Sequence, residues 1–251
     1  MKFRLLRHAT LLAEIASKKI LVDPMLSKKD ALDPVKNAAN TFRIPMVELP
    51  LNERELSLLI EEIDAVLVTH THRDHWDIAA QQLLHKDKPI FCQPADELLI
   101  KGQGFTNVQV IGDQVTWNAI TIYRTNGQHG TGDTGRAMGT VSGYVLEHNE
   151  NKLYIAGDTI WCSDVEAAIN THHPQHIIIN GGGAQFLQGD PITMTIDDML
   201  KLTTFTPVAV TVVHLDTVNH CLQKRTDFKN AIDSNNLTKR VQIPADGEWS
   251  R

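Results

Sequence analysis

Residues 69–76 have the sequence Thr-His-Thr-His-Arg-Asp-His-Trp, which places three imidazoles and one carboxylate within six positions. The run just upstream, residues 63–68, is apolar and has the length and β-branching of a buried strand. Open α/β sheets hold their functional groups at the carboxyl ends of strands, and imidazole and carboxylate are ligands of zinc and related metals. Because a single tetrahedral ion seldom uses so many groups, this stretch predicts one half of a two-metal site.

Chance clustering of histidines on a solvated loop is the alternative interpretation. The chain has 12 histidines in 251 residues, so a lone pair would carry little weight. The ordered His-x-His-x-Asp-His pattern directly after an apolar strand favours the metal site.

The composition is that of an ordinary globular protein. With 251 residues, 42% hydrophobic and 22% charged, the chain can bury a large core, and we predict a single domain over residues 1–251. The formal net charge is −6, so the chain lacks the excess of basic residues that is typical of a nucleic-acid binder. Three widely spaced cysteines, no secretory apolar segment and no membrane-length apolar run predict a reducing, cytoplasmic setting and no membrane partner.

Periodicity outside the histidine stretch predicts strands and helices in mixed order. Residues 11–15 and 20–22 resemble paired strands, and residues 53–62 and 77–85 resemble helices, the second with Ile78, Leu83 and Leu84 toward the core. Further strands are expected at 89–92, 108–111, 119–123, 141–146, 153–156, 177–179 and 208–213, and further helices at 95–101, 165–169, 195–202 and 226–232. Hairpins mixed with strand–helix alternation predict an α/β protein in which two sheets pack face to face with helices outside.

Three residues beyond the first stretch are candidates to complete a metal site. His129 and Asp158 each follow a predicted strand, and His214 follows the longest apolar run. A binuclear hydrolase needs a carboxylate that bridges ions about 3.5–4 Å apart. Asp158 is flanked by Gly157, which would allow backbone to approach closely.

Taken together, the chain resembles the metallo-β-lactamase superfamily of binuclear zinc hydrolases, in the branch that includes ascorbate-6-phosphate lactonase. The resemblance covers nearly the whole chain, and residues 64–75 carry its most specific motif. Other matching segments are residues 8–10, 20–24, 153–159, 180–183, 193–195, 213–217 and 246–248. The resemblance implies the four-layered αβ/βα sandwich of this superfamily, with two mixed β-sheets and helices outside.

The resemblance also implies the roles of seven side chains. It assigns His70, His72 and His129 to a first metal, assigns Asp74, His75 and His214 to a second, and makes Asp158 the bridge. Two Zn²⁺ ions are expected, with Mn²⁺ or Fe²⁺ as alternatives. Asp74 would orient the attacking hydroxide, and His220, six residues beyond His214, is the alternative last ligand. Asp23 and Thr69 are candidates to fix the imidazole tautomers.

The predicted activity is hydrolysis of a small polar or anionic ester, lactone or phosphoester by a metal-bridging hydroxide. The alternatives are a phosphodiesterase acting on cyclic nucleotides or nucleic acid, with nucleic acid disfavoured by the charge, and a non-catalytic metal-bearing binding protein. The expected partner is a small molecule, with a homo-oligomer allowed. His8 is predicted either to line the pocket or to be structural, residues 130–136 to form a mobile loop, and Arg136 either to clamp an anion or to be solvated.

Overall fold

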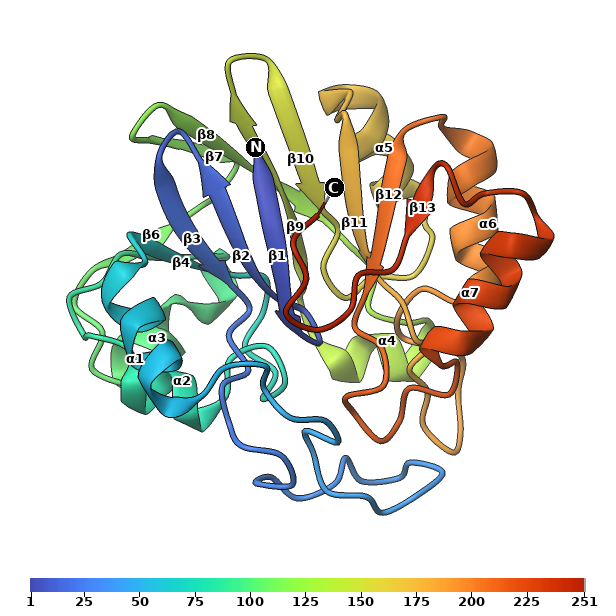
Figure 1. Ribbon diagram of the computed structural model, residues 1–251, viewed down its shortest axis with the longest axis horizontal. Coiled ribbons are helices and arrows are strands. Elements are labelled where there is room, and N and C mark those ends of the chain that lie inside the picture. Colours follow the sequence, from blue (N-terminus) through green and yellow to red (C-terminus); the bar gives the residue numbers. More distant parts are fainter. Residues whose placement is uncertain (251) are drawn as a thin grey trace.

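The computed structural model describes residues 1–250, whose strands form one six-stranded and one seven-stranded sheet (Figure 1). In the first sheet the strand order follows the chain, with antiparallel pairing through the first three strands and parallel pairing from the third onward. Its strands are β1 (Lys2–Arg7), β2 (Thr10–Ile15), β3 (Lys18–Val22), β4 (Ala65–Val68), β5 (Ile90–Cys92) and β6 (Val108–Val110).

The second sheet is also mixed. It is antiparallel from β7 to β10 and parallel from β10 to β13. Its strands are β7 (Gln114–Trp117), β8 (Ile120–Asn126), β9 (Ser142–His148), β10 (Asn151–Ile155), β11 (His176–Asn180), β12 (Ala209–Val213) and β13 (Val241–Gln242).

Three apolar layers hold the sheets and helices together. The inner faces of both sheets pack on each other through one cluster that includes Leu67 and Ile178. On β11, Ile177 and Ile179 point the other way and pack under helices, so successive residues serve opposite faces. A strand buried on both faces is a continuous apolar run, which is why the sequence pattern identified β4, β11 and β12.

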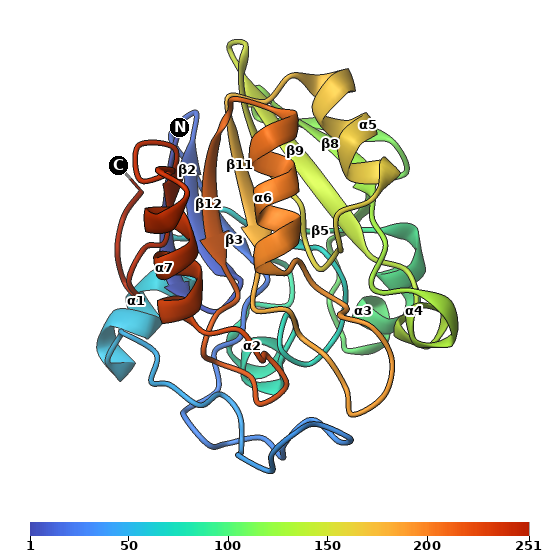
Figure 2. The ribbon, with the colours of Figure 1, turned by 90° about the vertical axis from the view of Figure 1, so that its right-hand side faces the viewer.

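Helices cover the outer face of each sheet, which confirms the predicted four-layered sandwich. Figure 2 shows α5, α6 and α7 over the second sheet, and Figure 1 shows α1, α2 and α3 beside the first. The helices are α1 (Glu53–Glu62), α2 (Ile78–Leu83), α3 (Glu97–Gly102), α4 (Gly132–Met138), α5 (Ser163–His172), α6 (Ile196–Phe205) and α7 (Arg225–Ser234), with a 3₁₀ turn at Pro94–Asp96. Across residues 1–250, no helix has the length and apolar content required to cross a membrane.

Several local predictions were wrong. Leu84 faces the core as predicted, but Ile78 and Leu83 are 50% and 47% exposed, because the short α2 turns Ala80 inward instead. Residues 130–136, predicted as a mobile loop, largely belong to α4. The edge strands β1 and β7 were missed, since their lysine, arginine, glutamine and threonine residues interrupt the apolar runs.

Candidate metal centre

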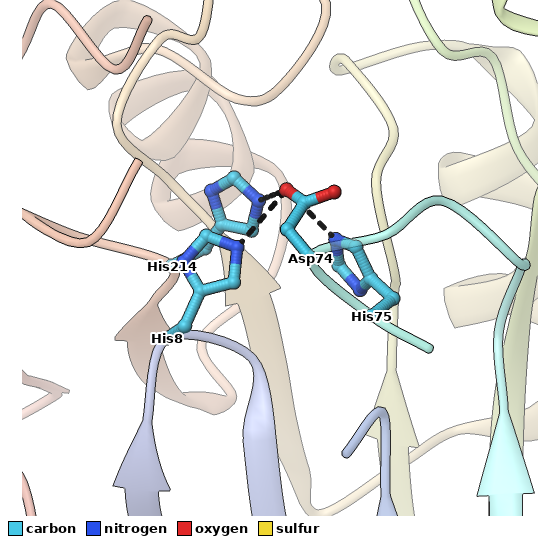
Figure 3. A group of neighbouring side chains, drawn as sticks. All are labelled: His8, Asp74, His75 and His214. Carbon is cyan, nitrogen blue, oxygen red and sulfur yellow. Dashed lines mark hydrogen bonds and ion pairs between the residues drawn. The ribbon is translucent and has the colours of Figure 1, made fainter. Parts of the chain in front are cut away.

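Each predicted ligand lies beyond the carboxyl end of a strand, at the end of the sandwich where the loops gather, below the sheets in Figure 1. His70 to His75 follow β4, His129 follows β8, Asp158 follows β10 and His214 follows β12. His8, in the turn between β1 and β2, comes to the same place (Figure 3).

The backbone beneath this cluster is held in an uncommon conformation. His8, Asp23 and His214 have φ values of 60°, 44° and 67°, in the left-handed region that residues other than glycine rarely adopt. Such conformations persist where the surrounding structure imposes them, and they concentrate at functional sites. Here these backbone conformations direct the three side chains toward the cluster.

The Asp158 carboxylate lies at the centre of the cluster. Its Oδ2 atom is 3.2 Å from His75 Nε2, 3.5 Å from His214 Nε2, 3.7 Å from His129 Nε2 and 3.9 Å from His70 Nε2. Its Oδ1 atom accepts a hydrogen bond of 2.7 Å from Asn180, which fixes the carboxylate plane. One oxygen surrounded by imidazoles from both predicted halves occupies the position of a bridge.

Asp74 is the carboxylate of the second group (Figure 3). Its Oδ2 atom lies 3.2 Å from His8 Nε2, 3.7 Å from His214 Nε2 and 3.8 Å from His75 Nε2. The ligand-type atoms of these four residues all lie within 4.8 Å of one another, the spacing of groups that can share one cation.

The first group consists of three imidazoles. His70 Nε2 and His72 Nδ1 are 3.0 Å apart, and a ring nitrogen of His129 lies within 4.8 Å of both. His70 and His129 are almost fully buried, whereas His72 is partly exposed at the mouth of the site. The structure therefore brings together all seven residues predicted from the sequence.

Four of the five predicted ligand histidines have a partner for the ring nitrogen that faces away from the cluster. Metal-bound imidazoles almost always donate their second N–H to an acceptor. His70 Nδ1 pairs with Thr69 Oγ1 at 3.1 Å, and His75 Nδ1 pairs with Asp23 Oδ2 at 2.9 Å. His129 Nδ1 donates to the Ile192 carbonyl at 2.7 Å, and His214 Nδ1 lies 3.5 Å from Cys221 Sγ.

His8 and His220 lack this support. Among the described residues, Nδ1 of each ring is buried and has no hydrogen-bond partner. His220 is also absent from the groups of ligand-type atoms found within residues 1–250, whereas His214 belongs to one of them. The geometry therefore favours His214 over His220 as the last ligand, and it favours His8 as a hydrogen-bond donor to Asp74.

Asp23, predicted as a partner of the ligands, supports two of them. It accepts hydrogen bonds from the Thr69 backbone N–H and hydroxyl, both at 2.7 Å, and from His75 Nδ1. Because Thr69 in turn accepts from His70, one buried carboxylate orients an imidazole of each group. Cys221 lies behind the His214 ring, as Asp23 lies behind the His75 ring. No motif in the sequence predicted this role for Cys221.

The pKa shifts in the site favour ionised carboxylates with positive charge beside them. Burial opposes ionisation of Asp158, but the neighbouring His214 and His75 outweigh it and hold its pKa well below the usual range. Burial likewise disfavours a charged His75, yet Asp158, Asp74 and Asp23 raise its pKa to about 10. Nε2 of His75 and of His214 face these carboxylates without a hydrogen bond to any described residue. Buried carboxylates ringed by imidazole lone pairs fit bound cations, which would replace the protons.

A cavity of about 210 Å³ opens onto the cluster. His72, Asp74, His129 and Asp158 face it, and Lys36 and Arg73 are cations that line it. Its apolar walls are Val35, Met138, Phe186 and Ile192. These walls come from the segment before α1, from α4 and from the loop before α6, so no local pattern in the sequence indicated them.

Other sequence candidates lie elsewhere. Arg136 is exposed and pairs with Asp133 on α4, so the structure favours the solvated alternative over an anion clamp in this cavity.

A side chain at Gly182 would meet the His214 carbonyl oxygen at 2.9 Å and Cys221 Sγ at 2.8 Å. The residue therefore allows two loops to pack closely, and its φ of 87° also favours glycine.

Two mixed sheets between helices, with a histidine and aspartate cluster at one end, define a protein of the metallo-β-lactamase fold. The profile of the beta-lactamase superfamily domain matches residues 18–214. The chain is 36% identical over 249 residues to the UPF0173 protein YddR of Bacillus subtilis, covering 97% of this chain and 96% of YddR. It therefore belongs to the beta-lactamase superfamily and, within it, to the UPF0173 group of metal-dependent hydrolases.

Two solved structures are similar over their full length. A possible metal-dependent hydrolase from Veillonella parvula is 36% identical, with a TM-score of 0.95 over 100% of this chain and 98% of that one. An isothiocyanate hydrolase from Delia radicum gut bacteria is 37% identical, with a TM-score of 0.94 over 100% of this chain and 99% of that one. The narrower resemblance to the lactonase branch stays a prediction.

Proposed function

We propose that the chain is a hydrolase with two divalent ions, in which His70, His72 and His129 hold one ion and Asp74, His75 and His214 hold the other. Asp158 would be the ligand common to both ions. The convergence of four imidazoles on this one oxygen is the observation that supports the proposal most directly. Zinc suits a site of imidazole and carboxylate ligands, with manganese and iron as alternatives.

Bound ions of this kind supply Lewis acidity and lower the pKa of a coordinated water to about 7. Side chains of the protein supply the rest of the chemistry. Asp74 faces the cavity and is held by His8, so it orients the attacking water and accepts its hydrogen bond. The surrounding walls limit the size of the substrate.

The substrate that this cavity fits best is a small, neutral electrophile with an apolar substituent. Four of its lining side chains are apolar, and its volume is about 210 Å³. An isothiocyanate meets these requirements, and the solved isothiocyanate hydrolase is 37% identical. In the net reaction, water oxygen bonds to the central carbon, the carbon–nitrogen bond breaks, and the products are an amine and carbonyl sulfide.

A small anionic ester, lactone or phosphoester is the second candidate. Lys36 and Arg73 line the same cavity and would face a carboxylate or phosphate. We infer a reducing, cytoplasmic setting because Cys92, Cys162 and Cys221 are all free thiols in the described chain.

The test is a substrate panel with protein of measured metal content. We expect about two ions per chain, and a higher kcat/KM on small isothiocyanates than on carboxylic esters, lactones, phosphomonoesters or cyclic nucleotides. A chelator should abolish turnover, and added metal should restore it. Turnover confined to the anionic compounds would favour the second candidate. Full metal loading without any turnover would favour a metal-bearing binding protein.

Asp23 provides a separate test of the ligand assignment. Replacing Asp23 with asparagine removes charge from the group that orients His75 and, through Thr69, His70. Losses of such supporting partners lower metal affinity by about 10–100-fold, and a chelator competition titration measures this. Asp64→Asn is the matched control, because Asp64 binds Lys18 and Lys19 near the opposite end of the same strands. Equal affinities for the two variants would contradict the assignment.

A further inference from the structure

His220 faces the same cavity but does not belong to the groups of metal-ligand atoms found in residues 1–250. It is 6% exposed, and it lies in the loop after β12 that also carries His214. The proposed metal centre alone does not explain why a buried imidazole faces this cavity.

One ring contact and one backbone contact hold His220 in place. It stacks on Phe186, with the ring centroids 5.7 Å apart and the planes 21° from parallel. Its backbone carbonyl accepts a hydrogen bond of 3.0 Å from the Gln185 N–H, in the loop before α6. Packing and backbone contacts therefore hold the imidazole in one orientation before any ligand arrives.

The neighbouring Asn219 secures the segment before α1 against the same loop. Its side chain accepts a hydrogen bond of 2.8 Å from the Val35 N–H and donates to the carbonyls of Val35 and Asn40 at 3.1 and 3.0 Å. Val35 forms another wall of the cavity. His220 thus lies where three segments are bound together around the space for a substrate.

The ring is polar and buried, and one of its nitrogens is unpaired. Its Nδ1 atom has no hydrogen-bond partner in the described part of the chain, and an unpaired buried polar group is unfavourable. A purely structural histidine would be expected to have a partner, as His176 does in Thr211 Oγ1 at 2.7 Å. A metal ligand would be expected to belong to one of the groups of ligand-type atoms in residues 1–250, and His220 belongs to none of them. Because the ring lines the cavity, a molecule bound there would supply a partner for it.

We propose that His220 hydrogen-bonds the substrate and that, with Phe186 behind it, it positions the heteroatom next to the carbon that water attacks. This inference rests on the proposed function. A neutral imidazole offers one N–H donor and one lone pair. With an isothiocyanate, water oxygen bonds to the central carbon while the carbon–nitrogen π pair moves to nitrogen, and the His220 N–H donates a hydrogen bond to that nitrogen. The remaining carbon–nitrogen σ bond then breaks with its pair going to nitrogen, and carbonyl sulfide leaves. Both hydrogens of the water finish on the amine, so His220 ends unchanged.

The experiment compares His220→Phe, which keeps an aromatic ring on Phe186 but removes both nitrogens, with His220→Gln, which keeps an N–H donor. Both variants should bind as much metal as the wild type, as measured by elemental analysis. With benzyl isothiocyanate as the probe, His220→Phe should lower kcat by about 10²–10³-fold, as for the loss of one donor to a developing charge. KM should change less, and His220→Gln should recover part of kcat. His85→Phe, at an exposed histidine on another face, is the control.

Different failures are distinguishable. If His220→Phe or His220→Gln loses one ion per chain, His220 is a ligand and the inference is wrong. If the metal content is unchanged and kcat/KM stays within about twofold of the wild type, His220 does not contact the substrate and only the inference is wrong. A wild-type protein that is metal-loaded but hydrolyses no isothiocyanate would overturn the proposed function and this inference with it.

Discussion

Replacing Asp158 with asparagine is expected to remove most of the hydrolytic activity and to lower the metal content. The change keeps the size of the side chain but removes the charge from the oxygen that lies 3.2–3.9 Å from four imidazoles. A metal acting as Lewis acid stabilises the transition state by several kcal/mol, and about 1.36 kcal/mol corresponds to a tenfold rate. We therefore expect kcat/KM to fall by at least about 10³-fold.

Elemental analysis and steady-state kinetics of the same preparation measure the two effects of Asp158→Asn. Asp87→Asn, which neutralises an exposed carboxylate away from the cluster, is the control and should match the wild type in both. Wild-type activity at full metal content in Asp158→Asn would remove the bridging role. If Asp158→Asn loses one ion and keeps half of the activity, Asp158 binds only one of the two ions.

Truncation of Trp76 to alanine is expected to cause the largest loss of stability. Its side chain is 1% exposed, packs on Phe105 with ring centroids 5.3 Å apart, and donates from Nε1 to Gln103 Oε1 at 2.7 Å. Truncating a buried aromatic residue costs about 3–5 kcal/mol. Because Trp76 follows His75, the cavity left behind should also loosen one proposed ligand.

Urea unfolding of Trp76→Ala measures this free energy, with and without a chelator. Trp76→Phe is the matched variant, since it keeps the aromatic contact but loses the hydrogen bond, and it should lose less stability. A loss below about 1 kcal/mol for Trp76→Ala would contradict the core role, because changes of that size are typical of less critical sites. A loss that appears only with the chelator would mean that bound metal compensates for the missing packing.

Local sequence patterns predicted most elements of this fold. Apolar runs buried on both faces form most of β4, β11 and β12 and the last three residues of β10. A predicted ligand follows β4, β10 and β12. The capped helices also begin where the sequence indicates, as with Asp77, whose side chain accepts from the Ala80 N–H. The edge strands and α4 were harder, because half-exposed elements mix polar and apolar residues and leave a weaker period.

The sequence by itself determined the fold class and the set of candidate ligands, because a dense histidine and aspartate motif after a strand is local information. The resemblance assigned His214 ahead of His220, and the tertiary structure adds geometric support, since His214 Nε2 faces Asp158 while Nδ1 of His220 has no partner. Only the tertiary structure placed Phe186, Met138 and Val35 around one cavity. These side chains come from segments far apart in the chain, and their proximity arises from how the loops pack, which no single stretch of sequence records.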